Sequence, residues 1–175
     1  WPFLCGRFRG AHPRPVSRQA LGAARKRLPL EYFRAMFHRL VERFGERFDK
    51  AMRWKGLRVL AADGSCLDLP ESPGIRKAFG GATNAQAFAR AVQARIVCLV
   101  SVFTGACVDF VLAPYAASEV HLLASMLPGL RPTDLVLLDR GYFGGGLLGL
   151  LLRRGVPFLM RAQKTIKPRK VRRLG

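Results

Sequence analysis

Two aspartates stand at the ends of short apolar runs, where their type and placement could support metal-dependent chemistry. One run is Leu57-Arg-Val-Leu-Ala-Ala-Asp63 and the other is Asp134-Leu-Val-Leu-Leu-Asp139. Each run is typical of a buried strand, and an acid at the carboxyl end of a strand opens onto a crevice at the edge of the sheet. If the two strands are neighbours, the carboxylates can share Mg²⁺, and a second ion can be held about 3.5 to 4 Å away with help from another acid. In-line displacement at a phosphodiester needs such a two-metal site.

Spacing alone leaves both aspartates open to plainer interpretations. Asp63 precedes Gly64 and Ser65, and Asp-Gly is a common turn dipeptide whose neighbours invite local hydrogen bonds. Asp139 precedes Arg140, with which it could form an ion pair, and it could instead cap the helix that follows. Each of these local roles would explain one acid without a metal.

The charge balance indicates a polyanionic partner. The 175 residues include 30 Lys and Arg against 11 Asp and Glu, which leaves a net charge of +19. A basic surface neutralises phosphates and releases counterions, so nucleic acid is the favoured partner. A solvated basic face, a ribosomal-type structural protein and a binder of membrane surfaces remain as alternatives. Most cations lie in residues 7–58 and 153–173 and flank a nearly neutral centre.

Cysteine spacing and hydropathy exclude several other classes of protein. The four cysteines form no CxxC pair and have no histidine at metal-ligand spacing, which argues against a zinc site or a redox motif. We expect them to be reduced core thiols; they are Cys5, Cys66, Cys98 and Cys107. No stretch approaches the roughly 18 to 20 apolar residues of a membrane span.

The first third of the chain is predicted to be a basic arm followed by an amphipathic helix. Residues 1–27 are rich in Arg, Pro and Gly and show little periodicity, so we expect a loop or an arm there. A helix is predicted from Leu30, because apolar residues recur at intervals of three and four. These are Leu30, Phe33, Phe37, Leu40, Val41, Phe44 and Phe48.

The remaining chain alternates predicted strands and helices. The strand that ends at Asp63 is expected to be followed by a turn at Gly64-Ser65. Further strands are expected at 91–103, 106–112, 134–139 and 156–160, with a hairpin turn at Thr104-Gly105 between the first two. Helices are expected at 119–127, with Ser118 as its cap, and at about 146–153. The pattern predicts an α/β fold, in which helices pack on a mixed sheet.

Two sequence blocks resemble the fourth insertion-sequence family of DDE transposases. The first is Asp63-Gly-Ser65 followed by Leu67-Asp-Leu-Pro, and the second is Leu137-Leu-Asp-Arg-Gly-Tyr-Phe143, the more specific of the two. The segments Gln19–Pro29 and Gly155–Arg161 also resemble parts of that family. The similarity runs from about residue 16 to about residue 163.

The resemblance implies a ribonuclease-H-like fold and an Asp-Asp-Glu triad that binds two Mg²⁺ ions, with Mn²⁺ as a substitute. It makes Asp63 the first acid and Asp139 the second. Residues 1–55 would then be a basic arm and helix, and residues 56–175 the first part of a catalytic domain. The third acid of the family lies in a later block with Tyr, Arg, Glu and Lys, whereas no residue after Asp139 here is acidic. We therefore expect an incomplete, truncated ribonuclease-H-like domain that is inactive by itself.

Several other charged residues are candidates for smaller roles. Arg140, Arg161 and Lys164 could hold DNA phosphates near the acids, although salt bridges or solvated charge would explain each of them as well. Glu119 could approach a metal from the start of its helix, but a partner of the helix dipole is the plainer interpretation. His121 is expected to be a surface or packing residue.

These observations favour a bacterial DNA transposase that cleaves and joins strands with Mg²⁺. Its partners would be transposon ends and target DNA, on which it would form a homodimer. No membrane partner is expected, and the protein would act in the cytoplasm, at the nucleoid. Two alternatives remain open: a DNA-binding remnant without chemistry, and a ribonuclease-H-like nuclease or resolvase that hydrolyses without joining.

Overall fold

A computed structural model describes residues 17–48, 51–81 and 91–161. The chain divides into two compact units, residues 1–40 and 41–175. The boundary expected near residue 55 from the sequence stays a prediction.

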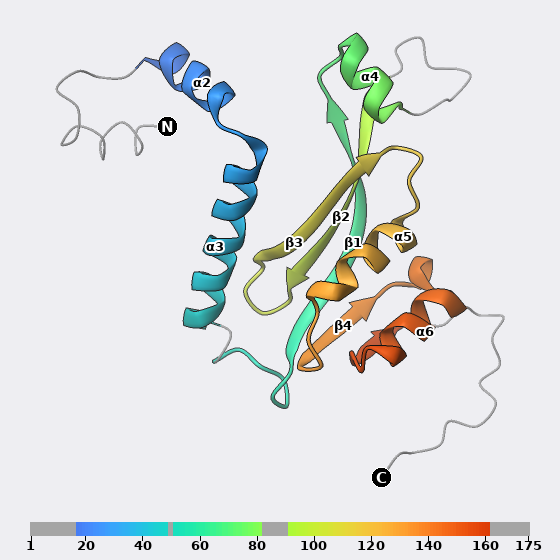
Figure 1. Ribbon diagram of the computed structural model, residues 1–175. Helices are drawn as coiled ribbons and strands as arrows, with labels where there is room; N and C mark the ends of the chain where they lie inside the picture. The colour runs from blue at the N-terminus through green and yellow to red at the C-terminus, as the bar shows by residue number, and fades with distance from the viewer. Residues whose placement is uncertain (1–16, 49–50, 82–90, 162–175) are drawn as a thin grey trace. The chain divides into compact units, whose positions relative to one another are not determined.

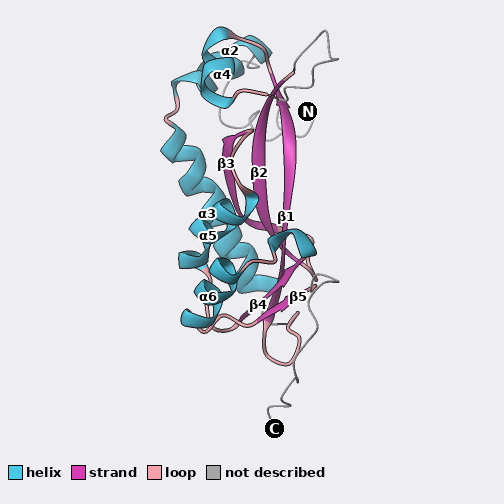
Figure 2. Ribbon diagram, turned by 90° about the vertical axis from the view of Figure 1, so that its right-hand side faces the viewer, coloured by secondary structure: helices cyan, strands magenta, loops and turns pink. Residues whose placement is uncertain are grey.

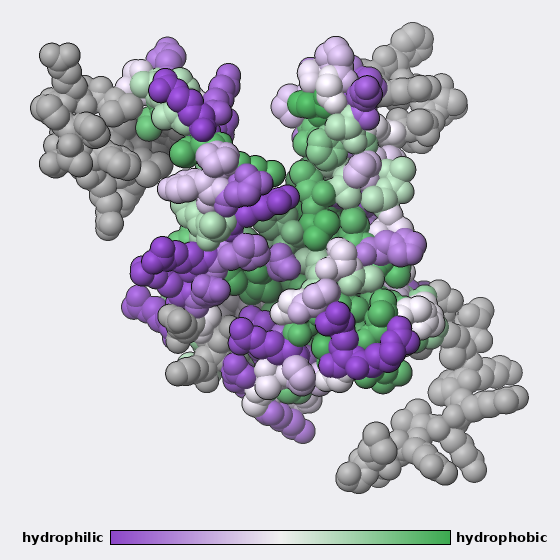
Figure 3. All heavy atoms as spheres, viewed as in Figure 1, coloured by the Kyte–Doolittle hydropathy of each residue, from purple (hydrophilic) through white to green (hydrophobic). Residues whose placement is uncertain are grey.

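The basic segment before Leu30 contains a helix that the sequence analysis missed. Helix α2 spans Arg18–Arg27, and the Ser17 side chain accepts a hydrogen bond from Ala20 N at its start (3.1 Å). The expectation of a loop is therefore wrong for residues 18–27, because a serine cap and the helix-forming Ala, Leu, Arg, Gln and Lys residues outweigh the single glycine of the segment. None of the α2 residues is buried, and hydrophilic side chains dominate α2 in Figure 3. Residues 1–16 lie outside the described residues.

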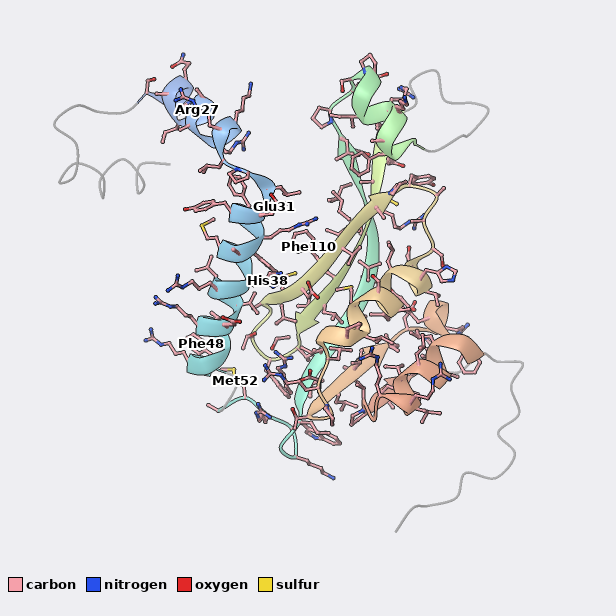
Figure 4. The ribbon with its side chains drawn as sticks, viewed as in Figure 1. Arg27, Glu31, His38, Phe48, Met52 and Phe110 are labelled. Atoms are coloured by element: carbon pink, nitrogen blue, oxygen red, sulfur yellow. The ribbon has the colours of Figure 1, made fainter. Side chains whose placement is uncertain are left out.

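Helix α3 spans Leu30–Phe48 and confirms the predicted amphipathic helix. Glu31 lies in its first turn, near the positive end of the helix dipole. Figure 4 labels Glu31, His38 and Phe48, which follow one another along α3. The Phe44 and Phe48 rings, one turn apart, contact each other at an interplanar angle of 39°, with 4.5 Å between their centroids.

Five strands form one mixed sheet in the order β3-β2-β1-β4-β5 (Figure 1). They are β1 Arg58–Leu69, β2 Val92–Ser101, β3 Cys107–Pro114, β4 Asp134–Leu138 and β5 Phe158–Met160. The first three strands pair antiparallel, whereas β4 pairs parallel to β1 and β5 parallel to β4. Three antiparallel strands joined along β1 to two parallel ones make the sheet of the ribonuclease-H-like fold, so the predicted fold class is confirmed.

Strand β1 continues past Asp63, which corrects the expected turn at Gly64-Ser65. Its antiparallel pairing with β2 runs from Leu60 to Leu69, whereas its parallel pairing with β4 stops at Ala62. Long-range pairing with β2 therefore keeps the polar second half of β1 extended. The β2–β3 turn at Thr104-Gly105 is confirmed, with Gly105 at a φ of +67° that favours glycine.

Helices α5 Glu119–Met126 and α6 Gly145–Arg153 cover one face of the sheet (Figure 2). Two short 3₁₀ helices, η1 Leu127–Gly129 and η2 Arg140–Tyr142, and helix α4 Pro73–Phe79 complete the described elements. The core between the helices and the sheet consists of Ala62, Val97, Leu99, Leu123, Met126, Leu127, Val136, Leu138, Tyr142, Leu147, Leu151 and Val156. On the other face Phe110, labelled in Figure 4, is 44% exposed.

A buried ion pair fixes the start of the parallel pair β1–β4. Arg58 and Asp134 are register partners, and Arg58 donates through Nε and Nη2 to the two carboxylate oxygens of Asp134 (2.8 and 2.9 Å). Asp134 is 1% exposed and also accepts from Arg131 N (2.9 Å). Because a fork-shaped guanidinium matches a carboxylate in one orientation, this pair favours one register along both strands.

Candidate active site

Asp63 and Asp139 come directly after the last register pair of two neighbouring parallel strands. That pair is Ala62 with Leu138, so each aspartate is the next residue along its strand. Asp139 keeps an extended backbone, with φ −75° and ψ −179°. Side chains alternate between the faces of a sheet, so both aspartates leave from the same side. The two exposed carboxylates therefore lie side by side at one edge of the parallel part of the sheet.

Each aspartate uses one carboxylate oxygen locally. Asp63 Oδ1 accepts from Gly64 N (2.9 Å), and Asp139 Oδ1 accepts from Gly141 N (2.8 Å), which makes Asp139 the cap of η2. The capping role considered for Asp139 is thus confirmed, and the turn role considered for Asp63 is wrong because Asp63 lies within β1. Neither local bond uses Oδ2, so both residues retain an oxygen that can bind a hard cation such as Mg²⁺.

Glu119, the first residue of α5, reaches β1 at Gly64, next to Asp63, from the helix-covered face. Its carboxylate lies against Gly64: a β-carbon at position 64 would stand 2.4 Å from both Cδ and Oε2 of Glu119. Gly64 has no positive φ, so space and not backbone strain requires glycine there. Glu119 Oε1 accepts from Arg95 Nη1 (2.5 Å), and Arg95 also donates to Tyr115 O (3.3 Å). The expected dipole role of Glu119 omitted this pairing.

Tyr142 lies in the core between the helices and the sheet, three residues after Asp139. It is 2% exposed, and its hydroxyl has no hydrogen-bond partner among the described residues. Burial raises the pKa of Tyr142 far above its ordinary value, and the negative charges of Glu119, Asp63 and Asp139 raise it further. The phenol therefore lies in the field of all three carboxylates.

The donor set suits a divalent cation bound by two carboxylates. Asp63 and Asp139 supply the oxygen ligands that Mg²⁺ prefers. Within the part of the chain that is described, no three His, Cys, Asp or Glu side chains come close enough to hold a metal ion together. Glu119 is thus near the aspartates without joining them as a third ligand.

The candidate phosphate-binding residues have different environments. Arg161 is exposed and follows β5, and its backbone N–H donates to Leu138 O (3.2 Å), so it lies beside Asp139 in the strand register. Arg140 is half-buried, and its Nε has no hydrogen-bond partner in the described residues. Lys164 lies outside the described residues. His121 is exposed on α5, as expected for a surface residue.

Comparisons with known proteins agree with the sequence blocks around the two aspartates. A family model described as transposase DDE domain matches residues 54–174. The Escherichia coli (strain K12) protein named putative transposase InsZ is 29% identical over 155 residues. That match covers 86% of this chain and 52% of the relative, so the chain spans about half of the relative's length.

The solved structures that match part of this chain include complexes of the Mos1 transposase. The Mos1 mariner paired end complex with Mn has 11% identity and a TM-score of 0.41, and the match covers 72% of this chain and 41% of the Mos1 chain. The Mos1 paired-end complex with left transposon end has 10% identity, the same TM-score and the same coverage. No helix among the residues that the structure describes is long and apolar enough to cross a membrane.

Proposed function

This chain belongs to the DDE transposase family, and we propose that it carries the first two metal ligands, Asp63 and Asp139, of a Mg²⁺-dependent DNA transposase. The observation that supports the proposal is the shared register of β1 and β4, which sets the two carboxylates side by side. DDE transposases generally use divalent metal ions. The chain covers about half of its E. coli relative, so the activity of a whole transposase is part of the proposal.

The proposed chemistry is cleavage of a DNA strand followed by joining of the freed 3′-hydroxyl to target DNA. A bound Mg²⁺ would activate the attacking oxygen and stabilise the charge on the phosphate. Asp63 and Asp139 would hold the Mg²⁺ ion in place. The sheet fixes their backbones, and one carboxylate oxygen of each already accepts a hydrogen bond from a backbone N–H. A third acid is required for a second ion, and these 175 residues contain none after Asp139.

DNA is the proposed substrate because the chain carries a net charge of +19. Arg161, beside Asp139 in the register, is the best-placed candidate for a phosphate contact, and Arg140 and Lys164 are proposed as further ones. A DNA substrate in a bacterium implies a cytoplasmic protein at the nucleoid, and a homodimer would hold two transposon ends. The DNA-binding remnant and the hydrolytic nuclease remain the competing functions.

Binding of Mn²⁺, followed by electron paramagnetic resonance, tests the metal site without requiring catalysis. We expect the wild-type chain to bind Mn²⁺ and the variants Asp63→Asn and Asp139→Asn each to lose most of that affinity. Asp68→Asn is the matched control, because Asp68 is an exposed acid of the same strand that lies beyond the pairing with β4 and accepts from Gln93 Nε2. Equal Mn²⁺ binding by all four proteins would exclude the proposed ligands and favour the remnant.

A further inference from the structure

Tyr142 presents a polar group that the fold itself does not satisfy. The residue is almost completely buried, since only 2% of its surface is exposed, and its hydroxyl has no hydrogen-bond partner in the described residues. Buried hydroxyls almost always have a partner, and exceptions occur where a ligand, an ion or a water completes the bond. Tyr142 is the last residue of η2, which Asp139 caps, and η2 contacts α5, which begins at Glu119, so the missing partner is expected on the side of the acid site.

Glu119 is held in place from two sides. Arg95 donates to Oε1, while Oε2 lies over the backbone of Gly64, next to Asp63. Arg95 is itself fixed by Tyr115, through its carbonyl oxygen and through the ring, whose centroid lies 5.2 Å from the guanidinium carbon. A side chain fixed in this way, in a space that only glycine leaves open, has a defined position beside the acid pair.

Glu119 does not share a single ligand cluster with the aspartates. It approaches β1 from the face covered by α5, whereas the Asp63 side chain leaves from the other face, beside Cys98. Pairing with β4 stops at Ala62, so the edge of β1 next to Asp63 and Gly64 is open, and an ion at that edge can be approached from both faces. One of its oxygens is occupied by Arg95, and no three acidic side chains of the described segments form a metal-binding group. Mg²⁺ bound through two carboxylates keeps several water molecules, and those waters need partners of their own.

We infer that Tyr142 and Glu119 are positioning residues that bind the hydration shell of the cation held by Asp63 and Asp139. The Tyr142 hydroxyl donates to a cation-bound water, and Glu119 Oε2 accepts from one. This inference rests on the proposed metal site. It adds a second layer to that site, formed by Tyr142 and Glu119, which would contact the cation through water and not directly. Groups of this kind orient ligands and water, and their loss typically weakens metal binding about 10-fold to 100-fold.

The test compares Mn²⁺ affinity with thermal stability in the complete 175-residue chain. We expect Tyr142→Phe and Glu119→Gln each to weaken Mn²⁺ binding by about 10-fold to 100-fold. In EDTA, Tyr142→Phe should unfold at the same temperature as wild type or higher, because it removes a buried hydroxyl that has no partner. A merely structural role predicts the opposite pattern, with lower stability and unchanged affinity. Tyr32→Phe, on an exposed residue of α3, is the matched control.

The outcomes separate this inference from the proposed function. Wild-type affinity in both Tyr142→Phe and Glu119→Gln, together with a loss of binding in Asp63→Asn, overturns the second layer and leaves the metal ligands intact. Absence of Mn²⁺ binding by the wild-type chain overturns the metal site and the inference with it. If Glu119→Gln does not fold, the isosteric Tyr142→Phe variant decides alone.

Discussion

The carboxylate of Glu119 occupies the space beside Gly64 that a side chain at that position would need. A β-carbon on residue 64 would lie 2.4 Å from Glu119 Cδ and 2.8 Å from Cγ, well inside van der Waals contact. Gly64 lies in the middle of β1, where glycine usually weakens a strand. The glycine in Asp-Gly-Ser therefore serves the approach of α5 to the site and not a turn.

Replacing Gly64 should destabilise the protein through Glu119 alone. We expect Gly64→Ala to cost about 1 to 3 kcal/mol, because Glu119 is held by Arg95 and cannot move without losing that pair. In Gly64→Ala/Glu119→Ala the collision is absent, so the double variant should be more stable than the sum of the two single effects predicts by about 0.5 to 3 kcal/mol. Urea unfolding measures all three.

Gly146→Ala is the control for this cycle. Gly146 lies in α6, where an added β-carbon would meet nothing within 4 Å, and alanine favours helix, so stability should stay equal or rise. Strictly additive effects of Gly64→Ala and Glu119→Ala would contradict the steric explanation.

The ion pair of Arg58 and Asp134 should contribute far more than an exposed pair. Asp134→Ala would leave the Arg58 guanidinium, 18% exposed, without its bidentate carboxylate, and we expect a loss of about 3 to 5 kcal/mol in the free energy of unfolding. Glu71→Ala removes the exposed partner of Arg76 and should cost about 1 kcal/mol or less. Similar losses in the two variants would show that the register does not depend on the buried pair.

Local patterns were sufficient to predict the strands that carry the two aspartates. The runs that end at Asp63 and Asp139 are apolar and short, and each became a strand in the sheet. The sequence did not predict that the two strands are neighbours, because the two runs lie far apart along the chain. The structure supplies this adjacency through the parallel pairing of β1 with β4, whose first register pair is Arg58 with Asp134.

Features that depend on distant partners could not be predicted. The second half of β1, residues 63–69, is mostly exposed and contains glycine and two aspartates, and its pairing with β2 makes it a strand. Arg95 gave no local signal beyond a charge within an apolar run, yet it fixes Glu119. Helix α2 was missed for a different reason, since its Arg-rich composition concealed a good cap at Ser17.

Cys98 should react slowly with alkylating reagents at mildly basic pH. Burial, followed by the neighbouring Cys107 thiol and the charge of Asp63, raises the pKa of Cys98 from about 9 to about 11. Because the thiolate is the nucleophile, only about one molecule in a thousand is reactive at pH 8, and reactivity should rise as pH approaches 11. Mass spectrometry after iodoacetamide treatment should find the exposed Cys66 modified well before Cys98.

Unfolding provides the control for the cysteine experiment. In urea the burial of Cys98 is lost, so both cysteines should be alkylated at similar rates. Equal rates in the folded chain would mean that the Cys98 environment does not suppress its ionisation.

DNA binding should be strongly dependent on salt and weakly dependent on sequence. With a charge of +19, the chain should release counterions at several phosphates, and six to ten contacts would reduce affinity by about 10³ to 10⁵ between 50 and 200 mM salt. Fluorescence anisotropy with two unrelated duplexes measures both dependences. An affinity that hardly changes over this salt range would contradict binding through phosphates.

The 175 residues alone should neither cleave nor join DNA. Asp63 and Asp139 can hold one cation, but in-line transfer depends on two ions flanking the attacked phosphorus, and the second ion needs another acid. The described residues hold no cluster of three metal-binding side chains, and the sequence has no acid after Asp139. Losing such charge stabilisation costs several kcal/mol, and about 1.4 kcal/mol is tenfold in rate, so turnover should be slow or absent.

The assay is incubation of the purified chain with labelled transposon-end DNA in Mg²⁺ or Mn²⁺, beside the variants Asp63→Ala and Glu119→Ala. Cleavage at the level of background in all three proteins is the expected result. Robust cleavage that disappears in Asp63→Ala would show that two aspartates suffice in this chain. If Glu119→Ala abolishes that cleavage as well, the cleavage depends on Glu119, either as a substitute third ligand through Oε2, which Arg95 does not bind, or through cation-bound water.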